Sequence, residues 1–314
     1  MRIDFWAVGQ GDCSCITFDD GEYILIDTGP RFSPIVNWFK QRTNEGIVTI
    51  KALVITHNHV DHCGALDSLL NIPGLNIHQI FILSNACKAS NNKLKECLLP
   101  LFEDAKYIHK VAIPRTPETI WEDDTRSIVI VAPTWQTQAS ESDVNKGSMI
   151  LKLTNKTKQC DEFMWGGDAF YNDLLPHMKP KAKLLMGPHH GAPQDIPTNV
   201  CPYCEYLFVS LSYKNCKQLH PNKDYIHNSV NAGISIACTC FTKNCKHNKT
   251  LVHPLEVGHI SPEEQPKSAR SFKESVYCRG GMYFTLIDNN WVIDDNETDY
   301  LSKKEQVFNR LCKL

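Results

Sequence analysis

A dense cluster of histidines and carboxylates follows an apolar run near residue 55. The run covers residues 52–55, and the motif after it contains His57, His59, Asp61 and His62. Along an extended segment, alternate side chains point to one side, which would aim the first three of these together. Imidazole and carboxylate groups at this density are ligands for a divalent metal. One ion cannot easily use all four groups, so the spacing predicts two metal ions side by side at the end of a strand.

The composition sets limits on the class of protein. A chain of 314 residues can bury a full hydrophobic core. Its formal net charge of -2 weighs against tight non-specific binding to duplex nucleic acid, which relies on Lys and Arg to neutralise phosphates. Fourteen cysteines argue for reduced thiols and metal binding before disulfides in an intracellular setting.

No targeting or membrane segment is evident in the sequence. Residues 1–6 have the pattern of a strand and lack the apolar core of a signal peptide. No stretch of about 18 consecutive apolar residues occurs, so nothing is expected to span a membrane. We therefore expect a soluble cytoplasmic protein with no membrane partner.

Expected strands and helices alternate along the chain. Short apolar runs predict strands, and amphipathic stretches predict helices at 34–42, 64–70, 93–104, 170–178 and 302–311. This interleaving is typical of a layered α/β protein. Each candidate ligand follows a strand, where open α/β sheets place their sites.

The metal motif and several other stretches resemble the metallo-β-lactamase fold in the same order. More narrowly, they resemble the hydrolase domain of ComEC-type DNA-uptake proteins and its soluble relatives. The resemblance covers roughly residues 1–240 and resumes near 280–294, and it implies a four-layer αβ/βα sandwich with helices outside two mixed sheets. The supporting stretches are the main motif, GQGD at 9–12, 24–29, 145–148, GGDA at 166–169, HHGA at 189–192 and His220-Pro221.

The resemblance also implies how the ions are held. His57 and His59 would hold the first ion, Asp61 and His62 the second, and Asp168 would bridge the two. The second ion would gain a later histidine, His189 as the first residue after a strand, with His190 as the alternative. The histidine that is not a ligand would make a supporting hydrogen bond. Asp27 matches a position that orients the ligand histidines.

One departure from the wider family concerns the first ion. Many relatives supply a further histidine to it from the region that corresponds to residues 132–148, and this chain has none there. The first site should therefore bind its ion more weakly than the second site does. We expect two divalent ions, Zn²⁺ where imidazole dominates or Mn²⁺ otherwise.

Two adjacent divalent ions favour in-line displacement at phosphorus, because they deprotonate a water and stabilise the attacking and leaving oxygens. Asp61 could orient that nucleophile, and His220 is a candidate general acid for the leaving oxygen. His220 could equally be a structural histidine. Asn145 and Ser148 are candidates to contact a substrate phosphate, or they form only a turn.

A segment rich in Cys and His interrupts the resemblance. We divide the chain into a hydrolase domain (1–239), an insertion (240–280), and the final strands with a C-terminal helix (281–314). Four residues of the insertion could form a structural zinc site, or its cysteines are free: Cys240, Cys245, His247 and Cys278. The Cys201–Cys204 pair has CxxC spacing, and its place before a strand favours a structural or partner-facing role.

These observations predict a metal-dependent hydrolase that cleaves phosphodiester bonds, as a nuclease acting on DNA or RNA. Three alternatives stay open. The first is a phosphodiesterase for cyclic or small nucleotides, and the second is a hydrolase of esters or lactams. The third is a non-catalytic or partner-activated subunit of a multi-protein system, such as a defence or DNA-processing complex, with the insertion as its protein-docking module.

Overall fold

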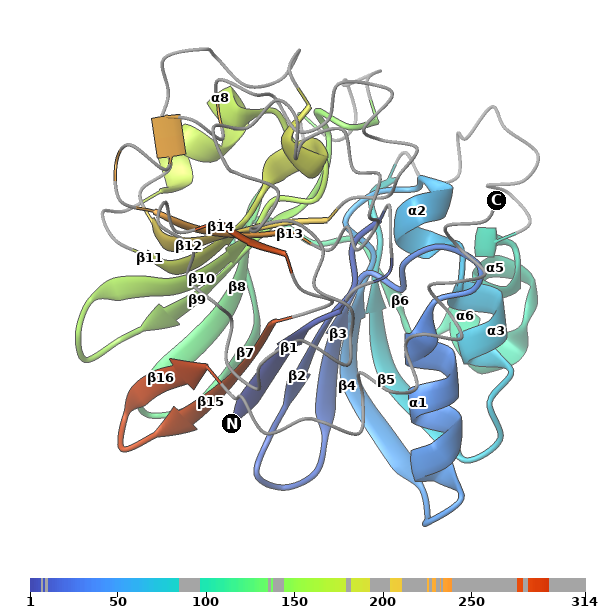
Figure 1. Cartoon of the computed structure of the whole chain (residues 1–314). Coiled ribbons are helices and arrows are strands. Elements are labelled where there is room, and N and C mark those ends of the chain that lie inside the picture. The colour runs from blue at the N-terminus through green and yellow to red at the C-terminus, as the bar shows by residue number, and fades with distance from the viewer. Residues whose placement is uncertain are drawn as a thin grey trace.

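Two mixed β-sheets pack face to face (Figure 1). The computed structural model describes residues 1–6, 8, 11–84, 97–134, 137, 144–178, 182–192, 204–210, 225, 228–229, 232, 234–238, 276–278 and 282–293. Within these ranges each sheet has eight strands. The first sheet has the order β16 (Asn290–Ile293), β15 (Met282–Ile287), β1 (Arg2–Phe5), β2 (Ser14–Thr17), β3 (Tyr23–Ile26), β4 (Val48–Val54), β5 (Leu75–Phe81) and β6 (Val111–Ala112).

The second sheet repeats this plan of antiparallel strands on one side and parallel strands on the other. Its order is β14 (Val276–Cys278), β13 (Ser235–Cys238), β12 (Cys204–Val209), β11 (Ala182–Met186), β10 (Cys160–Trp165), β9 (Ile150–Asn155), β8 (Arg126–Ala132) and β7 (Glu118–Glu122). Strands β7 to β10 are antiparallel, and β10 to β14 are parallel. In the first sheet, β3 to β6 are the parallel strands.

Aromatic side chains hold the inner faces of the two sheets together. Phe163 on β10 lies 6.0 Å from Phe5, 5.2 Å from Phe284 and 4.8 Å from Trp291, measured between ring centroids. These three partners all belong to the first sheet, on β1, β15 and β16. The edge-to-face geometry of Phe163 with Phe284 and Trp291 is favourable in addition to the burial. The core between the sheets therefore depends on strands from both ends of the described chain.

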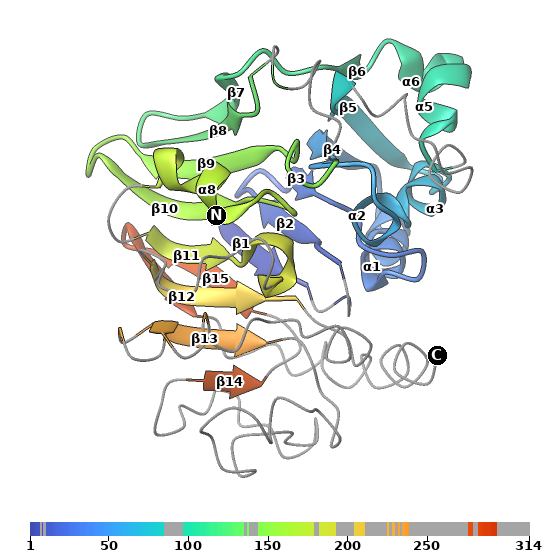
Figure 2. The ribbon, with the colours of Figure 1, turned by 90° about the horizontal axis from the view of Figure 1, so that it is seen from above.

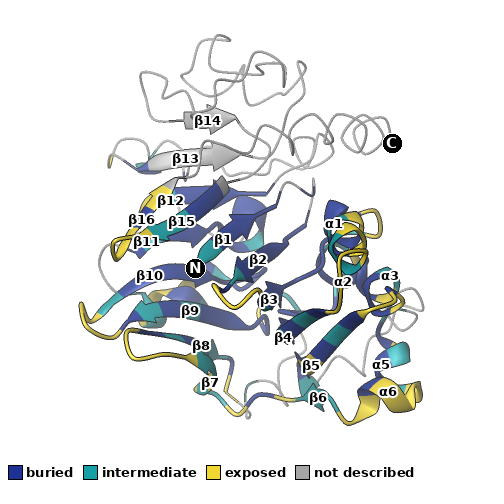
Figure 3. Ribbon diagram, turned by 90° about the horizontal axis from the view of Figure 1, so that it is seen from below, coloured by how far each residue is buried: buried dark blue, intermediate teal, exposed yellow. Residues whose placement is uncertain are grey.

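Helices cover the outer faces and complete four layers (Figure 2). The outer face of the first sheet packs against α1 (Pro34–Thr43), α3 (Leu66–Leu70), α5 (Pro100–Glu103) and α6 (Ala105–Ile108). The outer face of the second sheet packs against α8 (Tyr171–Leu174), which continues into the short 3₁₀ helix η2 (Leu175–His177). Figure 3 shows the sandwich strands as mainly buried and the helices as exposed on one side.

The sequence of α1 explains its position. Pro34 stands at the first turn, where its missing N–H costs nothing, and Lys40 and Arg42 complement the helix dipole in the last turn. Ile35 and Phe39, one helical turn apart, are buried against the sheet.

The predicted fold class, a layered α/β protein with two mixed sheets and outer helices, is confirmed. Several elements differ from their predicted extents. The apolar run at residues 80–83 predicts a short strand, but strand β5 already begins at Leu75. The polar strand β7 was not predicted. The described part of the predicted helix 93–104 ends at Glu103, and Asp104 begins α6 by accepting a hydrogen bond from the backbone N–H of Lys106. The predicted helix 302–311 lies outside the described residues.

The proposed insertion contributes one described strand. Strand β14 lies parallel to β13, with Cys278 aligned with Cys238. Cys240, Cys245 and His247 lie outside the described residues, so the zinc site and the domain boundaries stay predictions. No helix in the described part of the chain combines the length and apolar character needed to cross a membrane.

Replacing Phe163 with Ala should destabilise the fold by about 3–5 kcal/mol, because the change leaves a cavity between the sheets. Urea denaturation followed by circular dichroism would measure this. Ile47→Ala is the control, since Ile47 is 84% exposed, and its effect should stay within about 0.5 kcal/mol. Similar unfolding midpoints for the two variants would contradict the assigned core.

Candidate metal centre

Loops at the carboxyl ends of parallel strands supply the candidate ligands. The loop after β4 leads into α2 (Val60–Cys63), and the other two loops follow β10 and β11. Strand β4 belongs to the first sheet, and β10 and β11 belong to the second, so the site joins the two halves of the sandwich. The residues are His57 and His59 before α2, Asp61 and His62 within it, Asp168 after β10, and His189 and His190 in the 3₁₀ turn η3 (Pro188–Gly191).

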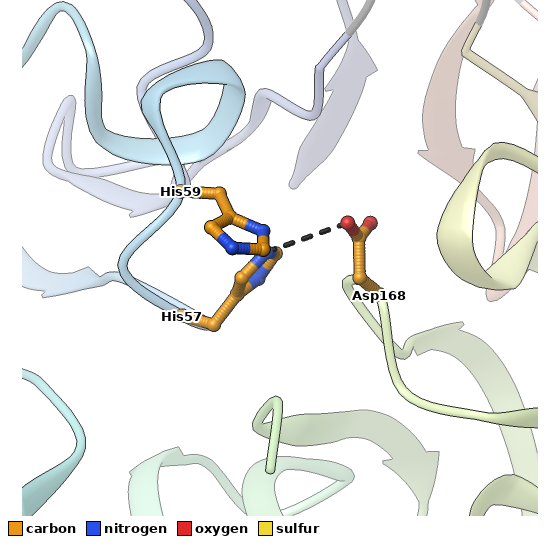
Figure 4. Close-up of side chains that lie close together, drawn as sticks. All are labelled: His57, His59 and Asp168. Carbon is orange, nitrogen blue, oxygen red and sulfur yellow. Dashed lines mark hydrogen bonds and ion pairs between the residues drawn. The ribbon is translucent and has the colours of Figure 1, made fainter. Parts of the chain in front are cut away.

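Asp168 lies at the centre of this arrangement. Its Oδ2 is 3.4 Å from Nε2 of His57, the contact drawn in Figure 4. Its Oδ1 is 3.1 Å from Nε2 of His62 and 3.5 Å from Nε2 of His190. The two oxygens of one carboxylate therefore face two different groups of imidazoles.

Each group is compact enough to hold one ion. In the first group, the ligand atoms of His57, His59 and Asp168 lie within 4.8 Å of one another. The same limit holds for Asp61, His62 and His190 in the second group, where His190 Nε2 is 3.5 Å from Asp61 Oδ2. With Asp168 as a shared ligand, the second site has four candidate ligands and the first has three.

Buried atoms without partners show that these groups fit a cation. Nε2 of His62, Nε2 of His190 and Oδ1 of Asp168 are buried and make no hydrogen bond within the described structure. Buried polar atoms are rarely left unpaired, because each costs about 1–3 kcal/mol. Here three converge on one point, and a divalent ion would satisfy all of them.

The electrostatics of the second group favour positive charge. Burial opposes protonation of His62, but the carboxylates of Asp168 and Asp27 outweigh it and raise its pKa well above the usual value. Burial likewise opposes charge on His190, yet Asp168 and Asp61 raise its pKa to about 9. Burial also works against ionisation of Asp61, but the adjacent His190 and the charge on His62 lower the pKa of Asp61 well below its usual value.

The first group behaves differently. Burial, followed by the nearby charge of His62, lowers the pKa of His57 to about 4. Burial is also the main cause of the lowered pKa of His59. Both imidazoles are therefore neutral near pH 7, which is the form that coordinates metal ions.

Asp27 lies directly behind His62. Its Oδ2 accepts hydrogen bonds from Nδ1 of His62 at 2.8 Å and from Oγ1 of Thr56 at 2.7 Å, and its Oδ1 accepts the backbone N–H of Thr56 at 2.7 Å. This arrangement keeps a proton on Nδ1 of His62 and leaves Nε2 directed toward Asp168, where an ion would bind. Carboxylates commonly orient metal-binding histidines in this way.

The structure separates the two candidate histidines after β11. His190, the alternative in the sequence analysis, joins Asp61 and His62 and is buried. His189 lies outside both three-residue groups, with a side chain 15% exposed and Nε2 3.7 Å from Oδ2 of Asp168. Both residues have left-handed backbone angles, with φ of 44° and 51°. This geometry favours His190 as the ligand of the second site.

The remaining predicted residues lie around the centre or outside the described chain. Ser148 is buried with its hydroxyl unpaired, and the backbone N–H of Met149 donates to the carbonyl of Thr56 beside the metal motif. The carbonyl of Asn145 accepts the N–H of Ser148 in the same turn. His220 and Cys201 lie outside the described residues, and Cys204 begins β12.

Sequence reasoning gave no role to Asp12, which the structure places at the centre. Its carboxylate is buried and lies within 4.8 Å of the ligand-type atoms of Asp27 and His62. Burial raises the pKa of Asp12 to about 7. The available signal was its position after two glycines in a turn that contributed to the family resemblance.

Comparisons with known proteins agree with this architecture. The sequence profile of the metallo-beta-lactamase superfamily matches residues 6–78, which include the main motif. A protein of Bacillus subtilis (strain 168), named "Probable metallo-hydrolase YflN", is 46% identical over 50 residues. That match covers 15% of this chain and only 19% of the relative. The motif, the profile and the two-sheet architecture together define a metallo-β-lactamase fold.

Solved structures show weaker likeness. The crystal structure of the BLEG-1 B3 metallo-beta-lactamase has a TM-score of 0.32 and 15% identity, over 54% of this chain and 72% of that one. A flavo di-iron protein mutant from Thermotoga maritima has a TM-score of 0.30 and 17% identity, over 53% of this chain and 37% of that one. Likeness at this level supports no statement about function.

Replacing Gly11 with Ala should disturb the metal motif, because the added Cβ would collide with the carbonyl oxygen of Asp61. Gly21→Ala is the matched control, since Gly21 also has a positive φ but faces open space. Both variants carry backbone strain, and only Gly11→Ala should also weaken metal binding. Metal titration with thermal unfolding would measure both effects, and equal metal affinity in the two variants would refute the contact.

Proposed function

We propose that this chain is a metal-dependent hydrolase that cleaves phosphodiester bonds, as a nuclease acting on DNA or RNA. The supporting observation is the position of Asp168, whose two oxygens face separate groups of candidate ligands. Such a shared carboxylate is suited to two divalent ions, Zn²⁺ or Mn²⁺, held close together. When bound, the ions would act as Lewis acids and would lower the pKa of a bound water to about 7.

The side chains around this centre have distinct roles in the proposal. His57, His59 and Asp168 hold the first ion, and Asp61, His62, His190 and Asp168 hold the second. Asp61 is partly exposed, with 23% of its side chain accessible, so it can also orient a nucleophile at the surface of the site. Asp27 fixes the direction of His62 through the 2.8 Å hydrogen bond. His220 is assigned as general acid from the resemblance alone.

The choice of nucleic acid as substrate rests on the resemblance to the ComEC-type hydrolase domain, which is a family analogy. The formal net charge of -2 provides no general attraction for phosphates, so substrate binding would depend on the ions and on local contacts. A protein partner could dock through residues 240–280.

The number of ions bound by single-residue variants should distinguish the two metal sites. Elemental mass spectrometry of the reconstituted chain should find two ions in this centre, plus one more if the insertion binds zinc. His57→Ala should remove one of the two and His62→Ala the other, whereas Asp168→Ala should weaken both because it deletes the shared ligand. The control variant is His78→Ala, which replaces a histidine on β5 and should retain both ions. Full occupancy in Asp168→Ala would contradict the shared site.

A substrate panel tests the reaction. The reconstituted protein with Zn²⁺ or Mn²⁺ should cleave single-stranded DNA, RNA or bis-p-nitrophenyl phosphate. Asp168→Asn, which is nearly isosteric, should lower the rate by at least about 100-fold, as expected when groups that stabilise developing charge are lost. Cleavage of cyclic dinucleotides alone would replace the nuclease assignment with a signalling phosphodiesterase. Loaded protein that cleaves none of these, with or without partners, would support the non-catalytic alternative.

A further inference from the structure

The backbone just before Asp12 is held at Gly11 by two contacts. It lies between β1 and β2, and Gly11 approaches the backbone of Asp61 so closely that no side chain could be accommodated there. On its other side, the carbonyl of Gly11 accepts a hydrogen bond from the hydroxyl of Ser210, at the end of β12. These contacts fix the backbone next to Asp12 beside the metal motif.

Asp12 faces the back of His190. Its Oδ1 is 3.7 Å from Nδ1 of His190, slightly longer than a hydrogen bond. Both atoms are buried, and neither has a hydrogen-bond partner within the described structure. On the opposite side of the ring, Nε2 is 3.5 Å from Asp61 Oδ2 and 3.5 Å from Asp168 Oδ1. The imidazole thus has one carboxylate behind it and two in front of it.

A closer form of this arrangement, with a hydrogen bond, exists at the neighbouring imidazole. Asp27 accepts the Nδ1 proton of His62 at 2.8 Å, while Nε2 of His62 faces Asp168. The two histidines of the second site therefore each have a buried aspartate on the Nδ1 side, one from the turn before β2 and one from the end of β3. Asp12 has an ion-pair contact with His190, and its carboxylate also lies within 4.8 Å of a ring nitrogen of His62.

We propose that Asp12 is a positioning residue for His190. It accepts the Nδ1 proton, holds that tautomer, and presents the Nε2 lone pair to the second ion, as Asp27 does for His62. This inference rests on the proposed two-ion hydrolase, and it makes Asp12 a support for a ligand histidine instead of a ligand. Loss of a carboxylate in this role typically weakens metal binding by about 10–100-fold.

The test measures metal affinity directly. Asp12→Asn and Asp12→Ala would be titrated with Zn²⁺ against a competing chelator, and with Co²⁺ followed by its absorption spectrum. One of the two ions should bind about 10–100-fold more weakly in Asp12→Ala, with a smaller loss in Asp12→Asn, whose amide oxygen can still accept the proton. The other ion should bind with unchanged affinity. Asp27→Asn should weaken binding of the same ion.

Asp4→Asn is the matched control. Asp4 is a buried carboxylate on β1 that pairs with Arg2, and this variant should lose stability without losing either ion selectively. Circular dichroism would confirm that each variant is folded, and Asp12→Asn decides the result if Asp12→Ala does not fold.

The outcomes separate this inference from the proposed function. Wild-type protein that binds two ions, with unchanged affinities in both Asp12 variants, overturns the role of Asp12 alone. Equal weakening of both ions, or loss of the fold in both variants, also overturns it and makes Asp12 a structural residue. Wild-type protein that binds fewer than two ions in this centre overturns the two-ion hydrolase and the positioning role together.

Discussion

The contact of Asp168 with imidazoles on both of its oxygens is the interaction on which the candidate site depends. It requires the end of β10, in the second sheet, to meet the loop after β4, in the first. That meeting is possible because the two sheets pack through aromatic rings such as Phe5 and Phe163. A change in the angle between the sheets would separate the two oxygens of Asp168 from their partners. The geometry of the site therefore depends on the packing of the core.

Much of this arrangement could be predicted from local patterns. Apolar runs followed by His57, Asp168 or His189 identify strand ends, and ligands at strand ends are expected to converge in a layered α/β fold. The polar strand β7 was not predicted, because its sequence, ETIWE, contains too few apolar residues to indicate a strand. The first residues of β5 were not predicted either, because polar residues in this strand interrupt the apolar pattern.

Two features of the site could not be derived from the sequence. His189 and His190 are adjacent, so strand position alone cannot separate them. The left-handed turn of η3 decides which ring enters the second group. Asp12 lies 45 residues before His57 and 178 before His190, and only tertiary packing brings it to the Nδ1 side of that ring. Local sequence carries the identity of such residues but not the direction in which they point.

The pairing of β1 with β15 has a consequence for how the chain acquires its structure. Residues 2–5 leave the ribosome well before residues 282–287, which form one of their two neighbouring strands. Until those residues are synthesised, β1 has an open edge, and the rings of Phe5 and Phe163 lack Phe284. Contacts at such large sequence separation slow folding, and open strand edges invite pairing with other chains. The first sheet can therefore be completed only after residues 282–287 have been synthesised.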